Sequence, residues 1–153
     1  MRALRSPKPV TATPYTVVHE TPAIDTYRHL RQATGIGPKT HAAAEAGLPN
    51  SLFAVQVLCD GRTVAMGRVI GDGGCFYQVV DIAVLPEHQG RGLGKAVMRE
   101  IAGYIEREVP ESAYVSLLAD GQAFRLYRQF GFALTAPDSL GMALVKGAGT
   151  GEG

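Results

Sequence analysis

The segment Leu85–Lys95, LPEHQGRGLGK, joins an apolar run to a long amphipathic pattern. It holds three glycines at alternate positions, Gly90, Gly92 and Gly94. An order of strand, glycine turn and helix leaves free N–H groups and the positive end of the helix dipole at the turn. Glycines also let the backbone approach an anion closely. These residues therefore predict a site for a phosphate-bearing ligand.

Two familiar phosphate-binding loops do not fit the turn. A Walker A loop anchored on Gly94 would need glycine where Gln89 stands and Ser or Thr where Ala96 stands. A dinucleotide fingerprint that starts at Gly90 has Lys95 in place of its last glycine. The turn must therefore hold its ligand in another way.

The sequence around the turn predicts a mixed α/β sheet covered by helices. Strands are expected at 15–20, 51–59, 62–70, 75–85 and 113–119, with two closing strands at 132–136 and 140–146. Helices are expected at 21–33, 39–46, 92–108 and 122–129. Asp60-Gly61 is a hairpin signal, and Thr21-Pro22 is a helix start. Strands in a meander followed by alternating helices and strands give about six to seven mixed strands with about four helices.

Composition indicates an ordinary globular domain. The 153 residues are 46% apolar and 19% charged, with a net charge of +1, so bulk charge gives no argument for nucleic acid. We expect a flexible arm at 1–13, a single domain at 14–146 and a flexible tail at 147–153.

The cellular location of the protein is predicted from the targeting and membrane-spanning segments that the sequence lacks. The start is basic and proline-rich without an apolar core, so it is not a signal peptide. No apolar stretch approaches the roughly 20 residues that cross a bilayer. Cys59 and Cys75 lie in strand-like stretches and are expected to be reduced thiols, with no metal site. A cytoplasmic protein that binds neither membrane nor nucleic acid is the expectation.

The turn does match another pattern. Gln89, Gly92 and Gly94 fit Q-x-x-G-x-G after a strand that ends DIAVLPE. In this context the pattern resembles the GNAT family of N-acetyltransferases, whose glycine turn wraps the pyrophosphate of coenzyme A.

A second motif extends the resemblance over about residues 15–146. The segment 120–132, DGQAFRLYRQFGF, is similar to the family's N-x-x-A-x-x-x-Y-x-x-x-G-F. The matching residues are Ala123, Tyr127, Gly131 and Phe132. Asp120 stands where the family usually has asparagine, so no role of that side chain is carried over. The resemblance implies a GNAT-like acyl-CoA N-acyltransferase fold.

The resemblance also implies acetyl-CoA as the cofactor and no metal. The turn residues that would hold the pyrophosphate are Gln89, Gly90, Arg91, Gly92, Leu93, Gly94 and Lys95. The pantetheine arm would pair with the main chain of Ile82, Ala83 and Val84, where the family's strand splays from its neighbour. Ala123, Phe124 and Tyr127 would complete this side of the cofactor site.

The implied chemistry is direct attack of an amine on the thioester in a ternary complex. Tyr127 matches the position where the family often has a general acid, and a phenol suits a leaving thiol. A backbone N–H near Ile82 or Ala83 would polarise the carbonyl. Asp81, an acid in an apolar run, needs a partner or a function. It is expected to bind the ammonium, to accept its proton through water, or to cap a structural network.

The acceptor is expected to be a small cationic amine. Tyr27, Asp72, Phe76 and Gln78 are the candidate substrate residues, because acids beside aromatic rings suit a cation. Gln78 stands where some family members carry a glutamate base, and an amide cannot take that role. A lysine or N-terminal amine of a protein remains an alternative acceptor, and a longer acyl group an alternative donor.

A different class of function also remains open, namely a non-catalytic acyl-CoA sensor or regulatory module. The resemblance further allows a homodimer, since the closing strands often form an interface in the family.

Overall fold

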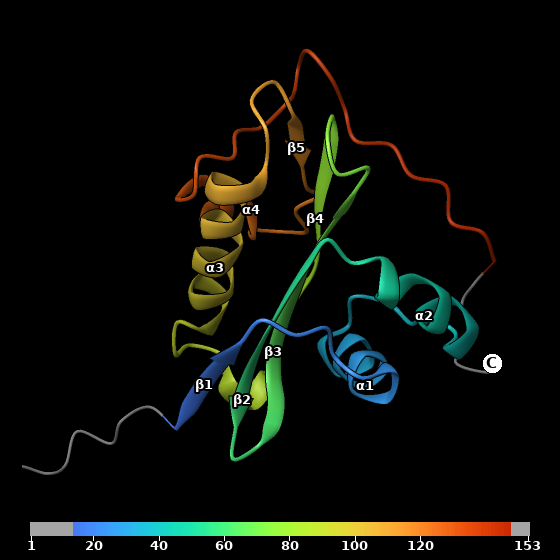
Figure 1. The fold of residues 1–153 in the computed structure, drawn as a ribbon, viewed down its shortest axis with the longest axis vertical. Coiled ribbons are helices and arrows are strands. Elements are labelled where there is room, and N and C mark those ends of the chain that lie inside the picture. The colour runs from blue at the N-terminus through green and yellow to red at the C-terminus, as the bar shows by residue number, and fades with distance from the viewer. Residues whose placement is uncertain (1–13, 148–153) are drawn as a thin grey trace, which may run out of the picture.

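A computed structural model describes residues 14–147 as a five-stranded sheet with helices on both faces (Figure 1). The strands are β1 Tyr15–Val18, β2 Phe53–Cys59, β3 Arg62–Gly71, β4 Phe76–Val84 and β5 Tyr114–Ser116. The helices are α1 Ile24–Thr34, α2 His41–Gly47, α3 Leu93–Glu108 and α4 Phe124–Arg128, with 3₁₀ turns η1 Leu48–Asn50 and η2 Pro86–His88. The predicted mixed α/β class is confirmed.

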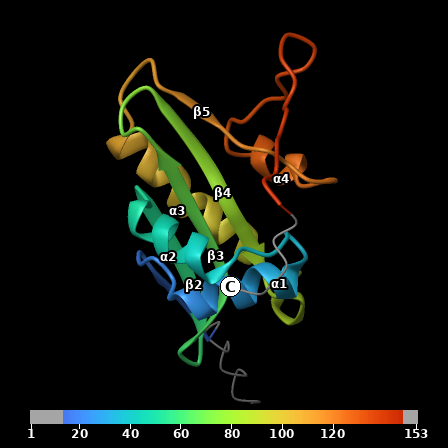
Figure 2. The ribbon, with the colours of Figure 1, turned by 90° about the vertical axis from the view of Figure 1, so that its right-hand side faces the viewer.

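The sheet follows chain order, with neighbouring strands antiparallel from β1 to β4 and β5 parallel to β4. Helix α3 covers one face, whereas α1 and α2 lie on the other (Figure 2). Each face of the sheet has its own apolar core. Helix α3 contributes the fully buried Val97, Met98 and Ile101 to one core, and α1 contributes the fully buried Leu30 to the other. The β2–β3 hairpin turns at Asp60 and Gly61, as expected.

Strand β4 carries one residue more than β3. Met66 pairs with Ala83, but Arg68 pairs with Val80, so β4 bulges between these pairs. Asp81 lies in the bulge with a φ of 61°, a left-handed conformation that is uncommon outside glycine. The bulge re-aims the middle of β4 toward α1.

Strands β4 and β5 then separate. They pair only over Phe76–Gln78 and Tyr114–Ser116, which leaves the β5-facing edge of 79–84 without a strand partner. This is the splay that the family resemblance implies. It exposes peptide groups along β4 between the glycine turn and the middle of the sheet.

Several element boundaries differ from the predictions. Helix α1 begins at Ile24 with Ala23 as its N-cap, so Thr21 and Pro22 lie outside it. Strand β5 is three residues long, rather than seven. The two closing strands, 132–136 and 140–146, do not form, and the predicted six to seven strands are reduced to five. Apolar alternation favours a strand, but a strand also needs a partner edge, and these segments reach none.

Cys59 and Cys75 form no disulfide in the structure. The predicted arm, 1–13, and all but the first residue of the predicted tail, 147–153, lie outside the described residues. Within 14–147, no helix has the length and apolar character needed to cross a membrane.

Candidate active site

The glycine turn at the start of α3 has the features of an anion site. Gly90 and Gly92 have φ values of 76° and 77°, and the space where a Cβ would project is open at both. Within residues 14–147, none of the amide N–H groups of residues 90–95 donates a hydrogen bond. These unpaired donors lie at the positive end of a 16-residue helix. They can satisfy several phosphate oxygens at once.

Side chains beside the turn hold its shape. The amide of Gln89 donates to the carbonyl of Val84 at 3.2 Å, which ties the turn to the end of β4. Arg91 donates to the hydroxyl of Tyr15 at 2.9 Å, and that hydroxyl lies 2.8 Å from Nδ1 of His88. Gln89 and Arg91 therefore position the turn with their side chains. Lys95 is exposed and, within the described residues, has no ion pair.

A cavity of about 490 Å³ lies at the middle of β4, bounded by α1, β3, β4, the chain after β5, and α4. Six of its lining residues carry the argument: Tyr27, Arg68, Gln78, Asp81, Ile82 and Tyr127. The free edge of β4 leads from the glycine turn to this cavity. A peptide-like arm anchored at the turn can therefore pair with β4 and place its end in the cavity.

Asp81 is held in a buried network. Its carboxylate accepts a hydrogen bond from Nε of Arg68 at 2.7 Å and one from the hydroxyl of Tyr27 at 3.1 Å, and it pairs with Arg31. Arg31 also donates to the carbonyls of Gly37 and Ile36. The Asp81 side chain is 4% exposed. Of the three roles left open by the sequence, the contacts match the structural network.

Burial and the negative charge of Asp81 raise the pKa of the Tyr27 phenol. Its hydroxyl already donates to Asp81, and the guanidinium of Arg68 lies 5.4 Å from the ring centre. Tyr27 therefore lines the cavity mainly with its ring and acts as a support for the Asp81 network.

Tyr127 projects from α4 to the cavity wall and is almost fully buried. Burial, and then the charge of Asp120, raises the pKa of the Tyr127 phenol, so the hydroxyl stays protonated at neutral pH. No described residue forms a hydrogen bond with that hydroxyl. A protonated phenol without a partner is free to donate to a ligand atom.

The remaining sequence candidates divide into two groups. Gln78, Ile82 and Ala123 line the same cavity, and Phe124 lines an adjoining cavity of about 360 Å³ that shares Tyr127. Asp72 and Phe76 line neither. Hydrogen bonds from the backbone N–H groups of Phe76, Gly74 and Cys75 lower the pKa of the Asp72 carboxyl, which fixes a turn. Phe76 is exposed at the far end of β4.

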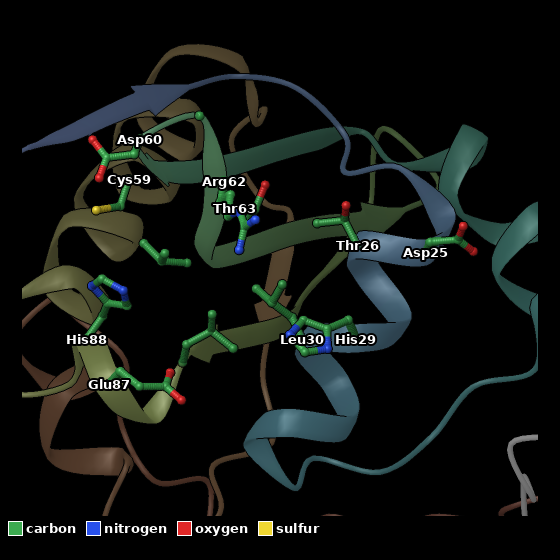
Figure 3. Close-up of a pocket in the computed structure, with 13 residues that line it drawn as sticks. Asp25, Thr26, His29, Leu30, Cys59, Asp60, Arg62, Thr63, Glu87 and His88 are labelled. Carbon is green, nitrogen blue, oxygen red and sulfur yellow. The ribbon is translucent and has the colours of Figure 1, made fainter.

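A larger cavity, about 980 Å³, lies on the other side of α1 (Figure 3). Figure 3 shows Asp25 and His29 from α1 across from Glu87 and His88 of η2. It shares no lining residue with the cavity at Tyr127 and includes no residue of the 90–95 turn. We therefore place the candidate site at Tyr127. Among the described residues, no group of His, Cys, Asp and Glu could hold a metal ion.

Sequence reasoning did not assign Arg31 and Arg68 as the partners of Asp81, nor Asp120 as a wall of the cavity. A signal did exist for Arg68, because an arginine inside the apolar run RTVAMGRVI needs a buried counter-charge. Arg31 lies on an amphipathic helix, where an arginine side chain can equally well be exposed to solvent. Its pairing with Asp81 is therefore known only from the tertiary structure.

Comparisons with known proteins agree with this geometry. A family model described as an acetyltransferase (GNAT) domain matches residues 50–134, more than half of the chain. A protein of unknown function from meticillin-resistant Staphylococcus aureus, described as a probable acetyltransferase, has 48% identity and a TM-score of 0.83. That match covers 86% of this chain and 99% of the solved one. A GNAT-family acetyltransferase from Streptococcus pneumoniae TIGR4 has 27% identity and a TM-score of 0.70. The match covers 86% of this chain and 98% of the solved one.

Two curated relatives are similar to this chain over only part of their own length. Serotonin N-acetyltransferase 2 from Oryza sativa is 37% identical over 87 residues, which is 56% of this chain and 42% of that protein. A GCN5-like protein acetyltransferase from Mycobacterium tuberculosis is 30% identical over 129 residues, which is 80% of this chain and 60% of that protein. The chain thus spans less than two thirds of either relative.

Proposed function

Because the chain belongs to the GNAT family of acetyltransferases, we propose that it transfers the acetyl group of acetyl-CoA to the nitrogen of a primary amine, by direct attack in a ternary complex. One observation carries the proposal. The unpaired amides of residues 90–95, the free edge of β4 and the hydroxyl of Tyr127 form a continuous path from an anion site to a cavity.

The residues that fit the cofactor are those of the turn and of β4. The amides of residues 90–95 would bind the pyrophosphate, and the peptide groups of 82–84 would pair with the pantetheine arm. Ala123 and Phe124 at the start of α4 would flank the arm. Bound acetyl-CoA supplies a thioester carbonyl that an amine can attack.

Two groups of this chain then act on the reaction. A backbone N–H near Ile82 or Ala83 stabilises negative charge on the carbonyl oxygen as the C–N bond forms. The hydroxyl of Tyr127 donates its proton to the sulfur as the C–S bond breaks. The attacking nitrogen loses one proton to water as it becomes the amide, and water returns a proton to the phenolate of Tyr127. Asp81 is saturated by Arg31 and Arg68, so it acts by holding the bulge rather than as the base.

Charge in the cavity favours the neutral amine. Among the described lining residues, the charged ones are the cations Arg31, Lys39 and Arg68 and the acids Asp81 and Asp120. An excess positive charge lowers the pKa of a bound ammonium, which makes the nucleophilic form more abundant. It also disfavours an acceptor that carries a second positive charge. We therefore narrow the expected cationic amine to a monoamine, which enters beside the exposed carboxylate of Asp120.

An arylalkyl monoamine is the first acceptor to test, because the rice relative is a serotonin N-acetyltransferase. Release of CoA thiol is measured with acetyl-CoA and a panel of arylalkylamines, amino acids, polyamines, aminoglycosides and lysine peptides. Amine-dependent release, highest for monoamines, supports the proposal. Tight binding of acetyl-CoA with no release on any amine favours the sensor. Absence of acetyl-CoA binding contradicts both functions.

A further inference from the structure

Two guanidinium groups share a single carboxylate beside the cavity at Tyr127. Asp81 pairs with both Arg31 and Arg68, and the side chains of both arginines are only 10% exposed. Two cations against one acid leave this cluster with an excess positive charge in a nearly buried position. Such a charge is costly where water is scarce. Both arginines line the cavity, so an anionic group of a ligand can supply the missing counter-charge.

The two arginines differ in what their nitrogens already bind. All three nitrogens of Arg31 are engaged, two by backbone carbonyls and one by Asp81. In Arg68, Nε donates to Asp81 and Nη1 donates to the hydroxyl of Ser51 at 2.8 Å, whereas Nη2 has no partner within residues 14–147. No fully buried side-chain nitrogen of those residues lacks a partner. Nη2 of Arg68 therefore reaches open space, where it can donate to a ligand.

The strand register places Gln78 beside Arg68. Across β3 and β4, Arg68 pairs with Val80 and Ile70 pairs with Gln78. Paired residues share a face of the sheet, and so do residues two apart along a strand. Arg68 and Gln78 are therefore diagonal neighbours on one face, about 7–8 Å apart. Gln78 lines the cavity, and its amide forms no hydrogen bond with any described residue, so it can donate to the same anion as Arg68.

Lys39 adds a third cation to the lining. It lies between α1 and α2, and it forms no ion pair within the part of the chain that the structure describes. The α4 side of the cavity instead carries the hydroxyl of Tyr127 and the acid Asp120. The cavity thus offers positive charge on its α1 side and a proton donor beside an acid on its α4 side. This arrangement suits a ligand that has an anionic end and an amine end.

We propose that the acceptor amine carries a carboxylate, which Arg68, Gln78 and Lys39 bind while the nitrogen faces Tyr127. This assignment rests on the proposed acetyl transfer and names its substrate class, an amino acid or a related amino carboxylate. Three cations and two acids give the described lining a net charge of +1. The reactive form of such an acceptor has a neutral nitrogen and a single negative charge, which matches the lining. An amine that bears a phosphate would carry close to two negative charges in that form, more than the lining balances.

The test measures release of CoA thiol from acetyl-CoA with amino carboxylates of increasing length, from glycine to aminohexanoate, and with phenylalanine. Each acceptor is paired with its carboxamide, which keeps the shape and removes the charge. In the wild type, kcat/KM is expected to be about tenfold to a hundredfold higher for at least one carboxylate than for its carboxamide, because hydrogen bonds to a charged group are stronger than neutral ones.

Two variants test which residues produce this preference. Gln78→Leu is expected to lower the carboxylate-to-carboxamide ratio of kcat/KM by about tenfold. Lys39→Met is expected to lower it by about twofold to fivefold, because Lys39 is exposed. Lys146→Met is the matched control, since Lys146 is an exposed lysine outside the cavity, and it should leave the ratio unchanged. Substitution of Arg68 would also break the Asp81 network, so the test uses the other two residues.

Three results would overturn the assignment. In the first, kcat/KM in the wild type is no higher for any carboxylate than for its carboxamide. In the second, Gln78→Leu and Lys39→Met leave the ratio unchanged, which means that the carboxylate binds elsewhere. In the third, phosphoethanolamine has a higher kcat/KM than β-alanine, which assigns the anion site to a phosphate.

Failure of acetyl transfer gives a different result from failure of the anion site. If no acceptor releases thiol, acetyl transfer itself is contradicted, and calorimetric titration with the same carboxylates then tests the anion site without turnover. Binding that Gln78→Leu and Lys39→Met weaken supports the site, and absence of binding overturns it.

Discussion

The Nε of Arg68 on β3 donates a hydrogen bond of 2.7 Å to the carboxylate of Asp81, where β4 carries its extra residue. Arg31 from α1 pairs with the other oxygen of the same carboxylate. The left-handed backbone of Asp81 costs about 1–2 kcal/mol, and these contacts offset it. The network therefore fixes the bulge beside the unpaired edge of β4.

Asp81→Asn is expected to lower the free energy of unfolding by about 3–5 kcal/mol, because two buried guanidinium groups lose their counter-charge. Urea unfolding checks this. Asp120→Asn is the control: Asp120 is exposed and has no ion pair within the described residues, so its loss should change stability by no more than about 0.5 kcal/mol. If Asp81→Asn lost activity with unchanged stability, a direct catalytic role would replace the structural one.

Tyr127→Phe is expected to lower kcat by about tenfold to a hundredfold, at the weak end of general acid catalysis because water can also supply the proton. The KM for acetyl-CoA should change little, since the ring is kept. Tyr104→Phe is the control, because Tyr104 belongs to the same apolar cluster as Tyr127 but stacks on Phe53 and does not line the cavity. An unchanged kcat in Tyr127→Phe would remove Tyr127 from the mechanism.

The pH profile separates the acid role of Tyr127 from a packing role. Burial and then Asp120 raise the pKa of this phenol, so wild-type kcat should hold until pH exceeds about 10 and then fall as the proton is lost. Asp120→Asn removes a negative charge that opposes ionisation, so it should move this fall to lower pH. A profile that Asp120→Asn leaves unchanged contradicts the assignment.

Gly92→Ala is expected to weaken acetyl-CoA binding by about tenfold, because an alanine at positive φ is strained by about 1–2 kcal/mol and the turn relaxes away from its anion-binding shape. Calorimetric titration measures the affinity. Gly35→Ala is the matched control. Gly35 also has a positive φ, 73°, and open space around its Cβ position, but it lies at the end of α1 and outside the glycine turn. Equal weakening by both variants would indicate a general loss of stability.

Gly67→Ala is expected to destabilise the fold by about 1–3 kcal/mol through overpacking. A Cβ at Gly67 would lie 2.7 Å from side-chain atoms of Ile82 and Val97, where α3 packs on the sheet. Thermal unfolding measures the effect. Gly47→Ala, at the end of α2 with open space, should be neutral or stabilising by up to about 1 kcal/mol. A neutral Gly67→Ala would show that α3 can shift without cost.

Local sequence was sufficient for the features that depend on neighbouring residues. The glycines at 90, 92 and 94 and the apolar stripe after them predict both the turn and α3, because positive φ and helix capping are local properties. Asp60 and Gly61 likewise predict the β2–β3 hairpin. The position of Tyr127 on a short helix also follows from spacing. The backbone shape of the glycine turn was therefore predictable.

The tertiary structure decided what depends on distant partners. The sequence left Asp81 with three roles, and only the approach of Arg31 from α1 and Arg68 from β3 distinguishes them. The alternation of 140–146 predicts a strand, but a strand forms only against an available edge, and the turn at 135–139 carries this segment away from β5. Secondary-structure preference is encoded within a few residues, whereas pairing of charges and strands depends on which surfaces the whole fold brings together.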